Sequence, residues 1–215
     1  KTCYLPITDN ILEIETIIGA QGRDNAIDGS TGISGQTSFI ANLAQETFTV
    51  ENLPGLGNLD FNVVNFVDIT GTSQGDELVG DGEENELRGE GGRDTLVGGA
   101  GNDRIFGGRG RDRLTGVDLN SANPGAGEID IINGNNGRDT IVLGDGSNVF
   151  YSFGGNSDFA DIQEFQTGRD MIELTGTLGD YFFNSDNTAI FLSANNDLIA
   201  QFTNGAFVEA DLSFV

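Results

Sequence analysis

The chain has 215 residues and a formal net charge of −24, because 34 Asp and Glu outnumber 10 Lys and Arg. So acidic a surface argues against nucleic acid and anionic lipid as direct partners, since both attract basic proteins. With no His and a single Cys, the chain also lacks the usual ligands of zinc, copper and iron–sulfur sites. No apolar run approaches the roughly 20 residues of a membrane-spanning helix, so we expect no membrane span.

The first stretch, 1–61, is expected to form an N-terminal β segment. Apolar pairs in 1–18 follow a strand-like pattern. Residues 30–61 cluster β-branched and aromatic side chains on both sides of a Pro-Gly turn, which predicts a pair of longer strands. We expect these strands to cap the repetitive region that follows.

A glycine turn at 19–27 interrupts this segment, and Asp24 in that turn is a candidate metal ligand. The eighth of the nine residues in this turn is the small Ala26, so the next residue, Ile27, is expected to supply the apolar contact. An EF-hand loop is rejected here, because Ala26 replaces a middle oxygen ligand and no bidentate Glu follows at the required distance.

A period of nine residues organises the middle of the chain. From Gly71 to Thr115 the sequence divides into GTSQGDELV, GDGEENELR, GEGGRDTLV, GGAGNDRIF and GGRGRDRLT. Every block opens with Gly, has Asp or Asn at its sixth place and has Leu or Ile at its eighth. Nine is neither the helical nor the strand period, so the pattern predicts stacked repeats with one glycine turn and one short strand each. The eighth-place side chains, which no block could bury alone, are expected to form a continuous core.

The block at 116–124 (GVDLNSANP) loses this pattern, since Ser121 stands at the sixth place and Asn123 at the eighth. The three blocks after it keep the frame: 125–133, 134–142 and 143–151. Residues 116–124 therefore form either one degenerate coil or a loop of one coil's length, and their Asn, Ser and Pro favour the loop.

From Ser152 onward aromatic stretches replace the repeat, and 152–215 is expected to form a C-terminal aromatic β cap. These stretches predict antiparallel strands, with turns such as Thr167-Gly168 and Asn204-Gly205 between them. An open end of stacked repeats exposes unpaired backbone, which such a cap would cover. A ligand- or partner-binding face is the alternative.

The nine-residue blocks resemble the RTX (haemolysin-type) calcium-binding nonapeptide, G-G-x-G-x-D-x-U-x. The match is nearly residue for residue at 89–97, 98–106 and 107–115, and it is close at 134–142. The resemblance implies an all-β fold: a parallel β-roll or β-helix over 62–151, with antiparallel β caps at both ends. It also implies several Ca²⁺ ions held between turns that lie two repeats apart.

Calcium takes six to eight oxygen ligands, among them carboxylates and backbone carbonyls. Stacked glycine turns offer carbonyls, and the sixth-place side chains offer carboxylates. The metal ligands that the resemblance implies are Asp24, Asp76, Asn85, Asp94, Asp103, Asp112, Asp130 and Asp139, together with Gly89, Gly91, Gly98 and Gly107.

Successive turns in such a roll fall on alternate edges. One edge is expected to carry Asp76, Asp94 and Asp112, and the other Asn85 and Asp103. If 116–124 forms a coil, Asp130 continues the first edge and Asp139 the second. If 116–124 loops out, Asp130 and Asp139 exchange edges.

Electrostatics suggests how calcium would act. Without ions, rows of neighbouring carboxylates repel one another, and very short strands cannot offset the entropy lost on ordering. With ions bound, binding free energy becomes folding free energy. The chain is therefore expected to be loose where calcium is scarce and to fold outside the cell. Its acidic and apolar end, 209–215, resembles the C-termini of RTX proteins exported by type I secretion.

Three functions are compatible with this pattern. The first is a non-catalytic, secreted structural, surface or matrix component, with a cell-surface or polysaccharide partner. The second is the calcium-binding C-terminal module of a larger secreted enzyme or adhesin. The chain itself is not expected to be an enzyme, because it has no His, G-x-S-x-G or H-E-x-x-H, although paired acids could in principle hydrolyse glycosides. The third is self-assembly into a homo-oligomer or filament through the end caps.

Overall fold

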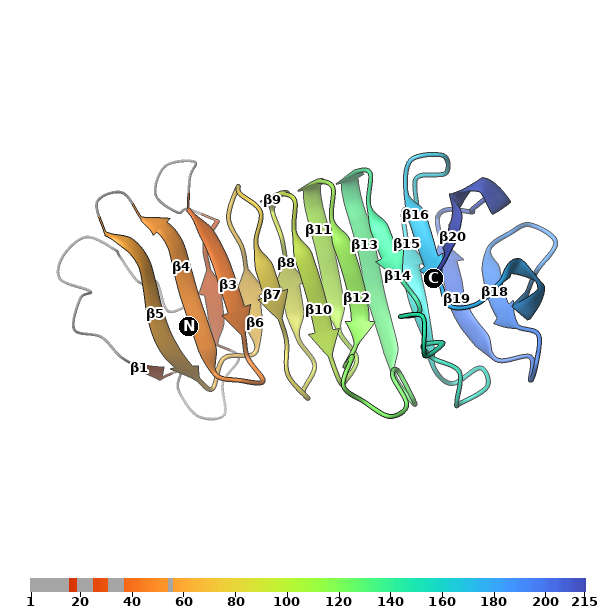
Figure 1. Ribbon diagram of the computed structural model, residues 1–215, viewed down its shortest axis with the longest axis horizontal. Coiled ribbons are helices and arrows are strands. Elements are labelled where there is room, and N and C mark those ends of the chain that lie inside the picture. Colours follow the sequence, from red (N-terminus) through yellow and green to blue (C-terminus); the bar gives the residue numbers. More distant parts are fainter. Residues whose placement is uncertain (1–15, 19–24, 31–36, 54–55) are drawn as a thin grey trace.

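The computed structural model describes residues 16–18, 25–30, 37–53 and 56–215. Regular structure within these ranges is β throughout, apart from two single 3-10 turns, η2 (Leu178–Asp180) and η3 (Glu209–Asp211). The strands form two ten-stranded sheets that follow the long axis of the molecule (Figure 1). The prediction of an all-β fold is confirmed.

The first sheet, called sheet A here, runs from the N-terminal end of the molecule to the C-terminal end. Its order is β1 (Thr16–Ile18), β5 (Gly57–Val64), β4 (Thr47–Leu53), β3 (Ser38–Asn42), β7 (Glu77–Val79), β10 (Thr95–Gly99), β12 (Arg113–Val117), β14 (Thr140–Val142), β16 (Met171–Leu174) and β20 (Leu212–Phe214).

The second sheet, sheet B, takes the strands between those of sheet A. Its order is β17 (Tyr181–Phe183), β18 (Ala189–Leu192), β19 (Leu198–Thr203), β15 (Phe159–Gln163), β13 (Ile129–Gly137), β11 (Arg104–Gly110), β8 (Glu86–Arg88), β6 (Asp68–Thr70) and β2 (Ala26–Asp28), with β9 (Gly91–Gly92) beside β11.

Successive repeats place their strands in opposite sheets, so parallel neighbours come from blocks two apart. Leu78 therefore pairs with Leu96, and Leu96 with Leu114, in sheet A. Leu87 pairs with Ile105 in sheet B. This alternation is consistent with a β-roll.

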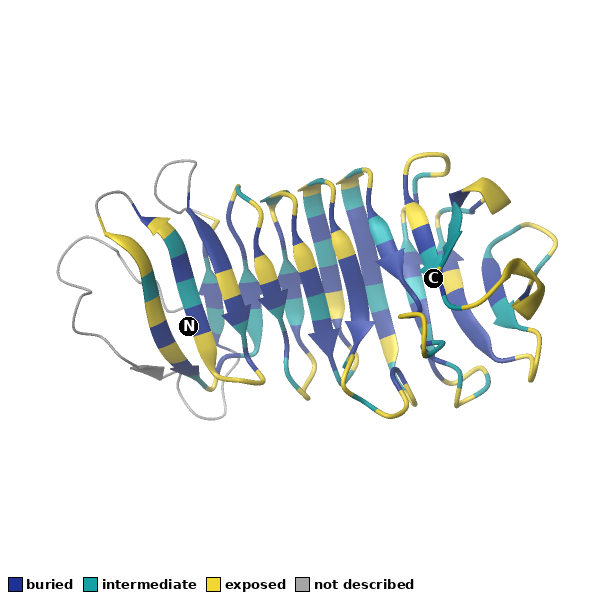
Figure 2. Ribbon diagram, in the orientation of Figure 1, coloured by how far each residue is buried: buried dark blue, intermediate teal, exposed yellow. Residues whose placement is uncertain are grey.

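The core consists of one column of aliphatic side chains along each sheet. A three-residue strand points only its middle side chain inward, so the eighth place of these blocks is buried, whereas its neighbours in β7 and β8 are intermediate or exposed (Figure 2). The columns are Leu78, Leu96, Leu114, Ile141 and Ile172 in sheet A and Ile69, Leu87, Ile105, Ile132 and Ile162 in sheet B, all at most 1% exposed. Ile27 pairs with Ile69 and is buried, as expected from the small Ala26 before it.

One block length leaves the stack between β12 and β13. Ile105 pairs with Ile132 and Leu114 with Ile141, so the paired residues lie 27 positions apart instead of 18. This spacing confirms the loop alternative, although the loop itself covers 118–128, because Gly116 and Val117 belong to β12. The loop is held by local hydrogen bonds, such as the one that the Asn120 N–H donates to Asp118 Oδ1.

The N-terminal end differs from the prediction, because three antiparallel strands (β3, β4 and β5) are present where two were expected. The stretch from Ser38 to Leu53 divides at a tight turn over 43–46. There Asn42 Oδ1 accepts a hydrogen bond from the Gln45 N–H, and Glu46 adopts a positive φ of 56°.

The C-terminal end also differs, because the expected antiparallel arrangement is limited to β17, β18 and β19. Strands β15, β16, β19 and β20 instead extend the parallel sheets. Their buried residues Ile162, Ile172 and Phe202 are spaced by 10 and 30 positions, which are not multiples of nine, so the period is hidden in the sequence. Among the residues that the structure describes, no helix is long and apolar enough to cross a membrane.

Candidate metal centre

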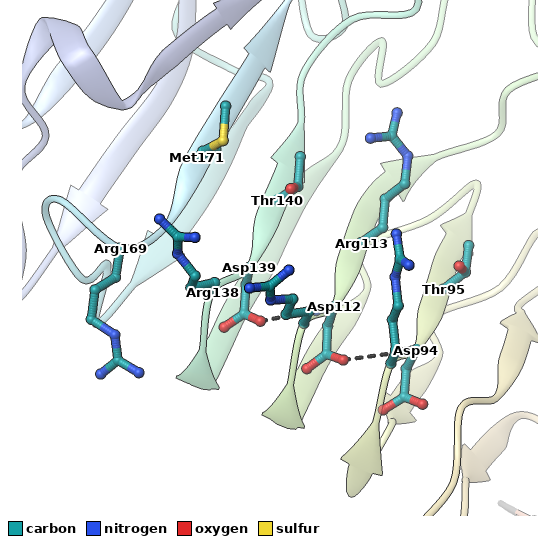
Figure 3. A pocket seen from close by; sticks show the side chains of 11 residues that line it. Asp94, Thr95, Asp112, Arg113, Arg138, Asp139, Thr140, Arg169 and Met171 are labelled. Carbon is teal, nitrogen blue, oxygen red and sulfur yellow. Dashed lines mark hydrogen bonds between the residues drawn. The ribbon is translucent and has the colours of Figure 1, made fainter.

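Two rows of acidic side chains follow the turns that precede the strands. In each row, Oδ1 of one acidic residue accepts a hydrogen bond from the backbone N–H of its counterpart one coil earlier on the same edge. Figure 3 shows this arrangement for Asp94, Asp112 and Asp139. Row one consists of Asp76, Asp94, Asp112, Asp139 and Asp170, with N–O distances of 2.8 to 3.1 Å. Row two consists of Asn85, Asp103 and Asp130, with N–O distances of 2.8 Å.

The membership of the rows follows from the loop. Because one block length is extruded, Asp139 continues row one and Asp130 continues row two, as the loop alternative requires. Asp170 was not among the predicted ligands. It stands in Gly168-Arg169-Asp170, which repeats Gly137-Arg138-Asp139, so the tripeptide could have revealed it.

The second carboxylate oxygens are left without partners in the middle of the rows. Oδ2 of Asp94, Asp103, Asp112 and Asp139 is buried and has no hydrogen bond to any described residue. All four side chains belong to residues that are at most 2% exposed. Buried polar atoms are nearly always paired, so a repeated series of unpaired carboxylate oxygens indicates a cation-binding site.

The first-place glycines leave space beside these oxygens. A Cβ on Gly98 would lie 2.3 Å from Asp103 Oδ2 and 2.4 Å from the carbonyl oxygen of Gly116. A Cβ on Gly89 would lie 2.4 Å from both Asp94 Oδ2 and the Gly107 carbonyl oxygen. In each of these turns, a carboxylate oxygen and a backbone carbonyl oxygen therefore lie close to the position that a Cβ of the first-place residue would occupy. This position is free because the residue is Gly.

Burial makes the rows electrostatically costly. Burial is the main cause that raises the pKa of Asp94 and of Asp103 to about 8; neighbouring carboxylates also raise it, and backbone hydrogen bonds lower it. Burial likewise raises the pKa of Asp139 to about 7 and that of Asp112 above its usual value. A divalent cation would remove this cost, because it compensates the charge that burial disfavours.

The carboxylates at the row ends already have hydrogen-bond donors for their second oxygens. Asp76 accepts hydrogen bonds from the N–H groups of Thr72 and Phe39, and Oδ2 of Asp170 accepts one from the Gln166 N–H. In row two, the buried Tyr151 hydroxyl donates to Asp130 Oδ2 at 2.5 Å. Among the members of the two rows, the free oxygens therefore lie in the interior; outside the rows, Glu128 Oε2 is also buried without a partner among the described residues.

Three other predicted ligands behave differently. Asn85 Oδ1 accepts a hydrogen bond from the Asp81 N–H, while its Nδ2 donates to the Val67 carbonyl. Gly91 lies in β9, and a Cβ there would meet only ordinary contacts, the nearest being the Arg109 carbonyl at 3.7 Å. Asp24 lies outside the described residues.

The donor set is rich in carbonyls. Within the described ranges, no group of three or more His, Cys, Asp or Glu side chains gathers at one point to hold a metal. Each candidate position therefore relies on one or two carboxylates and on backbone oxygens. Hard cations such as calcium accept this mixture, whereas zinc and copper prefer nitrogen and sulfur ligands.

A comparison with protein families decides what these turns are. The RTX calcium-binding nonapeptide repeat, in its four-copy form, matches residues 70–105, 79–114 and 124–157. The middle of the chain consists of RTX repeats. The RTX matches contain Asp94, Asp103, Asp112 and Asp139, and the unmatched interval between them, 115–123, overlaps the extruded block. A comparison with curated proteins found no match.

RTX repeats bind calcium, and the oxygens described above fit such an ion. Asp94, Asp103, Asp112 and Asp139 would hold it through their free Oδ2 atoms, with backbone carbonyls of the glycine turns completing the ligand set. The bound ion would supply positive charge to a row of buried carboxylates, while the strands between the turns hold those carboxylates in register.

Substitution of a first-place glycine tests this arrangement. We expect Gly98→Ala to weaken calcium binding by about tenfold or more, because the new methyl group would displace Asp103 Oδ2 or the Gly116 carbonyl from the point they share. Gly82→Ala is the matched control, since a Cβ on Gly82 meets nothing within 4 Å and its φ is not positive. Calorimetric titration with calcium measures both. Equal affinities would contradict the position assigned to the ion.

Proposed function

We propose that the chain is a secreted protein whose RTX roll folds by binding several Ca²⁺ ions, and that it serves outside the cell as a structural, surface or matrix component. The observation that supports this proposal most is the series of unpaired Oδ2 atoms on Asp94, Asp103, Asp112 and Asp139, each buried beside a glycine turn. No single enzyme site explains a feature that recurs along both rows.

Charge supports the extracellular part of the proposal. A chain of net charge −24 with buried acidic rows repels itself, and cations that bind oxygen offset this repulsion. Calcium is plentiful outside cells and scarce inside them, so the same rows would leave the chain loose during export and folded after it. Binding free energy then acts as folding free energy.

The strands at the two ends are proposed to act as caps. Antiparallel strands β3, β4 and β5 lie at one end and β17 and β18 at the other, where a stack of parallel coils would otherwise end in unpaired backbone. Self-assembly through these ends is a second candidate. Phe182 in the outermost strand β17 is 40% exposed and stacks on Phe191 at 4.9 Å, so an apolar surface is available there.

We do not propose a catalytic role for this chain, because repeats and terminal strands account for almost all of its regular structure. The alternative is that it forms the calcium-binding C-terminal module of a larger secreted enzyme or adhesin. In that case the catalytic or adhesive activity would reside in other residues of the parent protein.

Two measurements on the same sample test the proposal. Calorimetric titration is expected to detect several calcium ions per chain, and sedimentation is expected to show a compact particle in calcium and an expanded one in chelator. Absence of calcium binding would overturn the proposal. Particles larger than a monomer in calcium would support self-assembly, and monomers in both conditions would remove it.

A further inference from the structure

Four arginines form a second row beside the acidic row one. Arg93, Arg111, Arg138 and Arg169 each directly precede a row-one aspartate. The parallel registers of β10, β12, β14 and β16 make them neighbours in consecutive coils of one edge. Their Cα atoms are therefore spaced by about one interstrand distance, roughly 4.8 Å. All four residues are exposed.

Nothing described in the structure neutralises this arginine row by direct contact. The ion pairs found among the described residues join Arg88 to Glu86 and Arg113 to Glu173, and neither involves the row. The row nevertheless holds four of the ten basic residues of the chain. Like charges at this spacing repel one another, so the row favours an anion that lies along it.

The row borders a groove of about 330 Å³. Asp94, Asp112 and Asp139 also line this groove, together with Thr95, Arg113, Thr140 and Met171. Figure 3 shows Arg138 and Arg169 pointing away from each other. The guanidinium groups do not converge on one point, so the groove is not shaped to enclose a single phosphate. It fits an extended ligand that carries charges at intervals.

We propose that the arginine row binds a linear acidic polysaccharide, with carboxylate or sulfate groups along the polymer pairing with successive arginines. Guanidinium groups bind such oxyanions through two parallel hydrogen bonds, which favours Arg over Lys at these positions. The calcium dependence of this binding rests on the proposed function, because ions in row one would compensate the carboxylates beneath the arginines and leave the groove more positive.

A polysaccharide fits better than a nucleic acid. Double-stranded DNA carries one charge per roughly 1.7 Å of its axis, and a polymer so dense and wide would meet the acidic remainder of a protein of net charge −24. A thin polymer with one charge per sugar contacts a single row of side chains and avoids that repulsion.

Binding of the folded protein to immobilised dextran sulfate tests the inference, with neutral dextran as the reference surface and millimolar calcium present. We expect the double variant Arg111→Gln/Arg138→Gln to bind about tenfold more weakly or worse. We also expect the slope of the logarithm of the binding constant against the logarithm of the salt concentration to become shallower by about two, because the loss of two arginine–anion pairs releases about two counterions fewer. Arg104→Gln/Arg109→Gln is the matched control, because both residues are exposed on β11 in sheet B.

Each other outcome overturns the inference. Equal losses in the two double variants, or equal binding to neutral dextran, would remove the arginine row as the site. Tighter binding to single-stranded DNA, lost in the row variant alone, would reassign the row to nucleic acid. Dimers of the native chain that dissociate in the row variant would reassign it to the acidic surface of a second copy.

Circular dichroism of the same samples separates this inference from the proposed function. Folding without calcium, combined with loss of dextran sulfate binding in the row variant, would contradict the proposed function and leave the arginine row in place. Calcium-dependent folding, combined with unchanged binding by the row variant, would contradict the arginine row alone.

Discussion

Chelation of calcium at neutral or alkaline pH is expected to lower the melting temperature of the protein sharply and to weaken its β circular dichroism. The interior of each row then holds buried carboxylates that face one another without a counterion, and short strands of three residues cannot offset that cost. Restored calcium is expected to reverse both effects. Melting curves in chelator and in calcium measure the effect, and identical curves would contradict it.

The chelated protein is expected to regain stability in acid. The folded-state pKa of Asp94 and of Asp103 is raised to about 8 from the usual 3.8, so folding favours the protonated form of both groups. Their contribution to the free energy of unfolding is therefore most favourable below about pH 4 and is lost progressively as the pH rises to about 8. In the presence of calcium, the free energy of unfolding is expected to increase with pH instead, because protons compete with the ion for the same oxygens. A chelated protein that is more stable at pH 8 than in mild acid would contradict this explanation.

The substitution Asp103→Asn is expected to have opposite effects in chelator and in calcium. In chelator it removes a buried charge that has no compensating partner, so the melting temperature should rise. In calcium it removes a charged ligand, so calcium affinity should fall by about tenfold or more. Asn85, the preceding member of row two, already has this side chain and keeps its turn through two side-chain hydrogen bonds. Asn at the equivalent position is thus compatible with the fold.

The control for this experiment is Glu83→Gln, which removes one negative charge from an exposed residue of the same edge. It should leave the melting temperature and the calcium affinity close to those of the native chain, because exposed charges interact weakly. Melting in chelator and calorimetric titration in calcium measure both variants. A fall in stability of Asp103→Asn in both conditions would show that Asp103 acts only through its hydrogen bond to the Asn85 N–H.

The strict period of the middle of the chain explains why its core could be predicted. Leu78, Leu96 and Leu114 are spaced by two blocks, so the sequence alone indicates both their burial and their mutual contact. The same spacing placed Asp94 and Asp112 in one row. The spacing does not determine which edge carries Asp130 and which carries Asp139, because a coil and a loop of equal length preserve the same nine-residue frame.

The remainder depends on contacts that no period encodes. Asp170 lies 31 residues after Asp139, and its connection is longer than a block, so the frame gives no sign of it. The hydrogen bond from Tyr151 to Asp130 joins residues that are 21 positions apart through packing alone. The turn at 43–46 was missed because β-branched and aromatic residues on both sides of it read as one continuous strand.

The extruded block has a consequence for how such an array can grow. Each nonapeptide changes sheet, so duplication of a unit of eighteen residues returns every later strand and every later aspartate to its original side. Duplication of nine residues would transfer all of them to the opposite side. A lone additional repeat is therefore accommodated only by a loop outside the two sheets, such as residues 118–128 here, and arrays of this architecture should lengthen in even numbers of repeats.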